Sequence, residues 1–130
     1  MAENKIILDT SALLELSLGS DKGLKIKKAI EEAEAVFLPT IILAEFESKL
    51  RRSNVRLKGA PAAIAAGCLL LPLDDAAVAR DSGELHAEMR KTEPRISLID
   101  CILMVHSQRE KATVLTTDSH FRNFKDAIVF

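Results

Sequence analysis

The sequence predicts an α/β fold, a three-layer sandwich in which helices flank a central parallel β-sheet. Short apolar runs alternate along the chain with longer segments of helical periodicity, the order of elements in α/β proteins. The short runs are apolar throughout rather than at every second residue, which indicates parallel strands buried on both faces. Because 130 residues is the length of one domain, we expect residues 1–130 to form a single domain.

Five apolar runs are the predicted strands. Each is built around Ile, Leu, Val or Phe and is bounded by polar or turn-forming residues. They are residues 5–8, 35–38, 69–73, 113–116 and 127–130. Pro39 ends the second strand, because proline lacks the amide hydrogen that a ladder needs. The first strand ends abruptly on Asp9, and two hydroxyl residues then introduce a helix.

The segments between the strands carry helix signals. The predicted helices are residues 12–18, 21–33, 41–52, 61–66, 76–91 and 98–108, with a short turn or helix from Asp118 to Phe121. Thr40, Ser97 and one of Asp74 and Asp75 are expected N-caps, because their side-chain oxygens can accept hydrogen bonds from free amides. We expect an interruption of the fifth helix near Gly83.

The composition excludes several classes of protein. The formal net charge is −1, so the chain is not a strongly basic nucleic-acid binder by composition. Cys68 and Cys101 lie among apolar residues and form neither a disulfide framework nor a zinc pattern, which favours a reducing, cytoplasmic location. The longest apolar-rich stretch, residues 60–73, contains two prolines and falls short of the roughly 18 residues of a membrane span. We therefore expect no membrane association.

Four acidic residues occupy positions unlike those of surface acids. Asp9 and Asp118 follow strands, whereas Glu45 and Asp100 lie in the first turns of helices that enter from the same edge of the sheet. Taken singly, each has an ordinary explanation. The two acids after strands would cap the turns that follow, Glu45 would pair with a lysine at i+4, and Asp100 would form a capping box with Ser97.

Taken together, the four carboxylates predict a metal site at the edge where open α/β sheets bind ligands. Neighbouring carboxylates repel and raise one another's pKa, and a divalent cation removes that penalty. Oxygen ligands select Mg²⁺ or Mn²⁺ over zinc, and His86, His106 and His120 show no ligand spacing. Such a site suits phosphodiester hydrolysis, in which Ser11 and Thr116 would orient the attacking water or a carboxylate.

At these residues the chain resembles the PIN-domain family over nearly its whole length. The resemblance rests on residues 8–11, 44–45, 97–100 and 115–121, in this order and spacing. It implies a parallel sheet between helices and a metal-dependent ribonuclease that leaves 5′-phosphate and 3′-hydroxyl ends. The family's four acidic and two hydroxyl positions are matched here by Asp9, Glu45, Asp100, Asp118, Ser11 and Thr116.

Within that family, the small size resembles VapC-type toxins of toxin–antitoxin pairs. This resemblance implies an endoribonuclease acting on RNA, a homodimer, and a small antitoxin protein whose tail enters the active site. Residues 12–18, 21–33 and 57–66 are the candidate association surfaces. A basic run after Glu45 would track a phosphate backbone or form an ordinary solvated face. Its members are Lys49, Arg51, Arg52, Arg56 and Lys58.

The same sequence features are compatible with two other functions. The first is a receiver-like phosphoacceptor signalling domain, which needs paired acids after the first strand and a phosphoacceptor after the third. Asp74 and Asp75 follow the third strand, but Asp9 stands alone after the first. The second is a non-catalytic module that binds a partner protein on the same scaffold, for which we expect no metal affinity at the acids.

Overall fold

The computed structural model describes residues 4–53, 57 and 59–130. The strands are β1 (Lys5–Leu8), β2 (Ala35–Pro39), β3 (Leu69–Leu71), β4 (Thr113–Thr116) and β5 (Ala127–Val129). The helices are α1 (Thr10–Leu18), α2 (Asp21–Glu32), α3 (Thr40–Arg52), α4 (Ala60–Ala66), α5 (Ala76–Met89) and α6 (Leu98–Glu110), with one 3₁₀ turn, η1 (Ser119–Phe121). Within these described ranges, no helix combines the length and apolarity that crossing a membrane requires.

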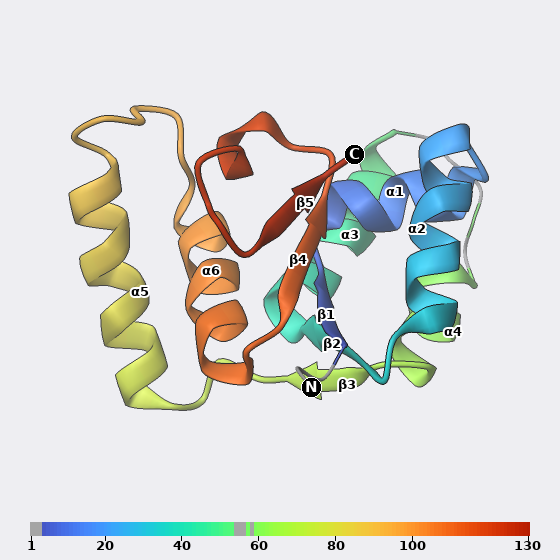
Figure 1. Ribbon diagram of the computed structural model, residues 1–130, viewed down its shortest axis with the longest axis horizontal. Helices are drawn as coiled ribbons and strands as arrows, with labels where there is room; N and C mark the ends of the chain where they lie inside the picture. Colours follow the sequence, from blue (N-terminus) through green and yellow to red (C-terminus); the bar gives the residue numbers. More distant parts are fainter. Residues whose placement is uncertain (1–3, 54–56, 58) are drawn as a thin grey trace.

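All the strands run parallel, in the order β3-β2-β1-β4-β5. The sheet lies between helical layers, with α5 and α6 on one side and α1, α2 and α4 on the other (Figure 1). This arrangement confirms the predicted fold class. The chain passes from β1 to β2 on one side and later enters β4 on the other, so the strand order reverses between β1 and β4. In open α/β sheets, ligands bind outside the carboxyl ends of the strands at such a reversal.

The register between β1 and β4 decides which residues meet at that point. Leu8 pairs with Leu115, and the amide of Asp9 donates a hydrogen bond to the Leu115 carbonyl at 3.1 Å. Leu8 and Leu115 are both buried in the core. Asp9 therefore lies beside Thr116, the last residue of β4, with the apolar core directly beneath both.

Some predicted helix starts are wrong by one or two residues, because capping geometry decides where a helix begins. α1 begins at Thr10, before the predicted start, because the Asp9 side chain accepts a hydrogen bond from the Thr10 amide. α3 begins at Thr40 itself, which was the expected cap. The extended backbone of Pro39 fills the cap position without a side-chain hydrogen bond. At α5 the second candidate acid, Asp75, is the cap.

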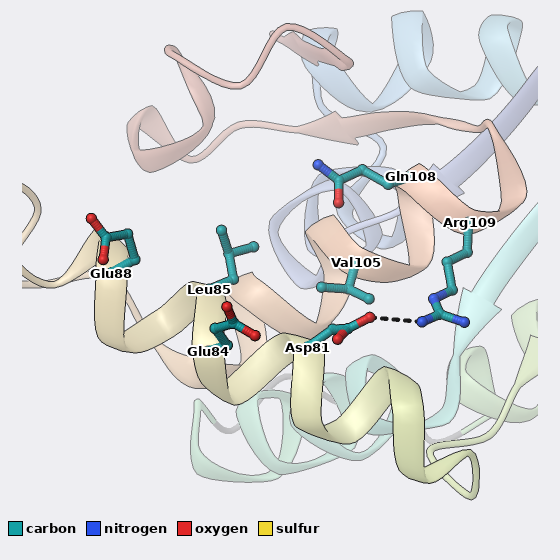
Figure 2. Close-up of a pocket in the computed structure, with 7 residues that line it drawn as sticks. All are labelled: Asp81, Glu84, Leu85, Glu88, Val105, Gln108 and Arg109. Carbon is teal, nitrogen blue, oxygen red and sulfur yellow. Dashed lines mark hydrogen bonds and ion pairs between the residues drawn. The ribbon is translucent and has the colours of Figure 1, made fainter.

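The expected interruption of α5 near Gly83 is also wrong. A helical glycine costs about 1 kcal/mol relative to alanine. That cost is offset because α5 packs along α6 and buries Val78 and Ser82 in the contact. Asp81 of α5 also pairs with Arg109 of α6 at 2.7 Å (Figure 2).

Strand β3 differs from the prediction in length and in burial. It ends at Leu71 rather than at residue 73, and its apolar side chains are not enclosed by the two helical layers. Leu69 is 56% exposed and Leu70 is 45% exposed. The cause is the strand's place at the edge of the sheet, where it pairs with β2 along one side only. The terminal strand is also shorter than expected, because β5 ends at Val129.

Helices α1 and α2 approach each other closely at Gly23, a buried residue in the first turn of α2. A Cβ atom added to Gly23 would lie 2.1 Å from the Glu15 carbonyl oxygen and 3.2 Å from the Leu16 Cα. Both neighbouring atoms belong to backbone, which cannot rotate away as a flexible side chain does. The glycine therefore fixes the separation of the two helices.

We predict that Gly23→Ala destabilises the protein by at least about 2 kcal/mol, because overpacking displaces backbone. The matched control is Gly83→Ala in α5, where a Cβ would meet nothing within 4 Å. That substitution should stabilise the protein by roughly 0.5–1 kcal/mol, because alanine is the better helix former. Urea unfolding of both variants measures these changes, and equal effects at the two glycines would contradict the close approach.

His106 is a buried histidine on α6, 5% exposed. Among the described residues, its Nε2 atom has no hydrogen-bond partner. Burial lowers the pKa of His106, with Arg109 acting in the same direction and Glu110 against it. Folding therefore favours the neutral form of this imidazole relative to the unfolded chain.

This burial gives the fold a predictable pH dependence. Because the folded-state pKa of His106 lies below its unfolded value, the unfolded chain binds the extra proton first. The contribution of His106 to stability is complete above the unfolded pKa, about 6.5, and is lost as the pH falls below it. The stability of wild type minus that of His106→Leu, measured in urea from pH 8 to pH 5, should fall on the acid side, because only wild type gains the proton. A difference that stays constant with pH would contradict this account.

Candidate metal centre

Asp9 lies at the reversal point between β1 and β4 and is only 4% exposed. Its Oδ1 accepts a hydrogen bond from the Thr10 amide at 2.8 Å. Its Oδ2 accepts from the hydroxyl of Ser11 at 3.0 Å and from that of Thr116 at 2.7 Å. Burial raises the pKa of Asp9, these three donors oppose the rise, and the nearby charge of Asp100 adds to it.

The hydroxyls of Ser11 and Thr116 join the ends of the two central strands. Each of these hydroxyls also accepts a hydrogen bond from a backbone amide that follows β4. The Thr117 amide donates to Ser11 Oγ at 2.9 Å, and the Asp118 amide donates to Thr116 Oγ1 at 2.9 Å. These two side chains therefore orient the Asp9 carboxylate and the segment that carries Asp118.

Asp100 lies in the first turn of α6 and is 9% exposed. It forms the expected capping box with Ser97: its Oδ2 accepts from the Ser97 amide at 3.2 Å, and its own amide donates to Ser97 Oγ at 3.0 Å. Burial raises the pKa of Asp100; contacts of its carboxylate with the backbone amide and the side chain of Ser97 oppose this, Asp118 raises the pKa further, and His120 lowers it. The Asp100 carboxylate therefore caps α6 and also lies close to another acid of the predicted site.

Asp118 and His120 complete a cluster with Asp100. Asp118 caps η1, and its Oδ1 accepts from the His120 amide at 2.9 Å. One carboxylate oxygen from each acid and one ring nitrogen of His120 all lie within 4.8 Å of one another. The sequence analysis found no ligand spacing among the three histidines and assigned none of them to the site, whereas the structure places His120 beside these acids. Its spacing of two residues from Asp118, at the start of a turn, was the available signal.

Glu45 reaches the site through one neighbour. It is half-buried on α3, and its Oε1 accepts a short hydrogen bond from the hydroxyl of Thr10, the residue after Asp9. Among the ion pairs of the described ranges, none joins Glu45 to Lys49, the alternative partner at i+4. Thr10, 1% exposed, is a contact that the sequence analysis missed.

The donor set fits a divalent cation. Asp9 and Asp100 are buried carboxylates with raised pKa values, and each senses the charge of another acid. A cation among them removes both the desolvation and the repulsion. The Nδ1 atom of His120 is shielded from solvent and, within the described residues, has no hydrogen-bond partner. The carboxylates that would hold a cation are therefore those of Asp100 and Asp118, with the buried carboxylate of Asp9 near enough to sense the charge of Asp100.

The predicted basic run is only partly described. Lys49, Arg51 and Arg52 lie in the last turn of α3, the end away from Glu45. Arg51 pairs with Glu47 at 3.1 Å, an ordinary contact on a solvated helix face. Arg56 and Lys58, together with the helix break expected at Asn54, lie outside the described residues.

A separate groove lies between α5 and α6 (Figure 2), with a volume of about 490 Å³. Acidic side chains of α5 line one wall, and Val105 and Gln108 of α6 line the other. None of the four predicted acids contributes to this groove. The acid cluster and the groove are therefore different features of the surface.

Comparison with known proteins identifies both a family and a fold. A family model described as "PIN domain" matches residues 6–127. Mycobacterium tuberculosis VapC20, a sarcin-ricin loop cleaving toxin, has 18% identity and a TM-score of 0.74, over 94% of this chain and 96% of that one. VapBC2 from Rickettsia felis, bound to a DNA fragment from its promoter, has 17% identity and a TM-score of 0.72, over 96% of each chain.

A third solved structure, a toxin–antitoxin complex from Klebsiella pneumoniae, has 16% identity and a TM-score of 0.69, over 96% of this chain and 97% of that one. Because the sequence identities are this low, the similarity to these solved structures shows a shared fold only. No curated protein sequence matches the chain.

The raised pKa of Asp100 leads to a prediction about stability. Because the folded-state pKa of Asp100 lies above its unfolded value, ionisation of this carboxylate destabilises the folded state as the pH rises through the raised pKa. In metal-free protein, Asp100→Asn should therefore raise the Tm at pH 7. Mn²⁺ at about 100 times its Kd should stabilise wild type by about 2.7 kcal/mol and have little effect on the variant.

Thermal scans with and without Mn²⁺ measure both effects. The matched control is Glu84→Gln, which removes an exposed acid of α5 outside the cluster. It should leave both the Tm and the response to Mn²⁺ unchanged. A lower Tm for metal-free Asp100→Asn, or an undiminished Mn²⁺ response, would show that Asp100 is an ordinary cap.

Proposed function

The chain belongs to the PIN-domain family, and on that premise we propose that it is a divalent-metal-dependent endoribonuclease and the toxin of a toxin–antitoxin pair. The observation that carries the proposal is the meeting of buried, mutually repelling acids at the carboxyl ends of β1 and β4. A folded protein keeps such an arrangement only where something compensates for it. Bound Mg²⁺ or Mn²⁺ is the compensation that these carboxylates favour.

In this proposal, Asp9, Glu45, Asp100 and Asp118 are the catalytic and metal-binding acids. When bound, the cation supplies an activated water and stabilises charge on the phosphate. Asp9 is held in one orientation by its three hydrogen-bond donors, and Glu45 is anchored by Thr10. These contacts fix carboxylates in place before substrate arrives, which lowers the cost of ordering the site.

Ser11 and Thr116 act in the proposal through the carboxylate that they orient. Each hydroxyl donates to Oδ2 of Asp9, so neither is free to turn toward a substrate without releasing that oxygen. Their role is thus to set the direction in which Asp9 presents its charge. This is the kind of outer contact on which the affinity of metal sites depends.

RNA is the proposed substrate, and a basic surface is the expected complement to it. Setting aside the four acids at the site changes the formal charge from −1 to +3, so the rest of the chain is net positive. Lys49, Arg51 and Arg52 on α3 supply part of that charge. The proposal also draws on VapC20, whose structure is described as that of a sarcin-ricin loop cleaving toxin.

The proposed partners are a small antitoxin protein and a second copy of the chain. Structures with the same fold include VapBC2 and other toxin–antitoxin complexes, which supports an antitoxin partner here. We propose a homodimer and a cytoplasmic location as parts of the same assignment; Cys68 and Cys101 are both free, as a reducing compartment requires. A receiver-like function finds no support, because Asp75 is engaged as the cap of α5.

The experiment is an RNA-cleavage assay on purified protein with Mg²⁺, with Mn²⁺ and with EDTA. We predict metal-dependent cleavage that leaves 5′-phosphate ends, and a loss of at least about 100-fold in Asp9→Asn and Asp100→Asn, because each variant removes a charge that holds the cation. Glu84→Gln should retain wild-type cleavage.

Circular dichroism checks that every variant is folded. Full cleavage by both aspartate variants, or cleavage that persists in EDTA, would reject the proposal. Mn²⁺ binding without cleavage of any RNA would reject the enzyme assignment, while the complete absence of metal binding would favour a partner-binding module.

A further inference from the structure

His120 presents one ring nitrogen to the acid cluster. Its Nδ1 lies 3.4 Å from Oδ1 of Asp118 and 3.7 Å from Oδ2 of Asp100. The atom is shielded from solvent and, among the described residues, has no hydrogen-bond partner. A buried polar atom without a partner is costly, so its position between two carboxylates calls for a physical reason.

Both separations are within the range of an ion pair but are too long for a hydrogen-bonded one. When a charged imidazole pairs with a carboxylate, the nitrogen–oxygen distance is about 2.7–2.9 Å. Both distances at His120 exceed that range, and both carboxylate oxygens already accept other donors: Oδ1 of Asp118 accepts the His120 amide, and Oδ2 of Asp100 accepts the Ser97 amide. The nitrogen is therefore near the acids without being bonded to either.

The separations are close to the distances between two ligand atoms of one metal ion. Two ligands about 2.1 Å from an octahedral cation are about 3 Å apart when adjacent and about 4.2 Å apart when opposite. The three donor atoms of Asp100, Asp118 and His120 lie within 4.8 Å of one another. Small side-chain movements would bring all three onto one ion.

The backbone holds the imidazole in this position. His120 is the middle residue of η1, which Asp118 caps, and the next residue, Phe121, is fully buried. The Phe121 ring meets that of Phe124 edge to face, with centroids 6.4 Å apart. Because the turn is anchored on both sides of His120, the ring is presented to the acids before any ion arrives.

We propose, resting on the metal-dependent function above, that Nδ1 of His120 is a direct ligand of the cation held by Asp100 and Asp118. An imidazole ligand favours first-row transition-metal ions over Mg²⁺, which prefers oxygen alone. The site accordingly selects a transition-metal ion, with Mn²⁺ as its probe, in spite of its mainly carboxylate composition.

The experiment measures coordination rather than activity. Pulsed electron paramagnetic resonance of Mn²⁺-loaded wild type should show the coupling of a directly bound imidazole nitrogen, and His120→Gln should lack it. In Mn²⁺/Mg²⁺ competition, His120→Gln should lose at least about 10-fold of the preference for Mn²⁺. His86→Gln is the matched control: its Nε2 lies 3.2 Å from the Ile96 carbonyl oxygen and is not among the clustered ligand atoms, so the variant should keep both properties.

The outcomes separate this inference from the proposed function. Mn²⁺ bound without a coordinated nitrogen in wild type would overturn the role of His120 and leave the carboxylate site standing. The role of His120 would also be overturned if His120→Gln kept the imidazole-nitrogen coupling or the wild-type preference for Mn²⁺ over Mg²⁺. The absence of binding by either ion would overturn the metal site and this inference together. The wild-type spectrum decides the ligand role even where the variant fails to fold.

Discussion

A carboxylate held out of water at the junction of two parallel strands is the constraint on which this structure depends. Asp9 is buried at the carboxyl end of β1, where its charge has little access to solvent. Three donors from Thr10, Ser11 and Thr116 partly replace the lost hydration. Because one of these donors comes from β4, the same contacts that make the charge tolerable also fix the two central strands relative to each other.

The arrangement of the other acids follows from this junction. The Asp118 amide donates to the Thr116 hydroxyl, so the position of Asp118 is tied to the group that orients Asp9. Glu45 reaches the site through Thr10, the first residue of the helix that Asp9 caps. Helix α6 contributes Asp100 from its first turn, where a carboxylate also interacts favourably with the helix dipole. Local capping and site assembly therefore use the same hydrogen bonds.

The sequence allowed the fold class to be predicted because apolar runs and their spacing are local properties. It also brought out Asp9 and Asp118 as acids that follow strands, since parallel strands present their carboxyl ends at one edge. The spacing of His120 from Asp118 was a signal that the two lie close together, but the approach of one ring nitrogen to both acids could not be predicted, because it depends on how a short 3₁₀ turn orients the ring. The exposure of Leu69 and Leu70 was equally beyond it, because an apolar run does not reveal whether its strand is central or at an edge.

The close packing at Gly23 has a consequence for genetics. Helix α1 starts from the cap that Asp9 provides and is pressed against α2 at its other end, so it connects the acid cluster to a glycine in another helix. A screen for inactive alleles would recover substitutions at Gly23 as well as at the acids. Such alleles would act by displacing α1, and a loss-of-function map alone would not distinguish a remote packing residue from a member of the site.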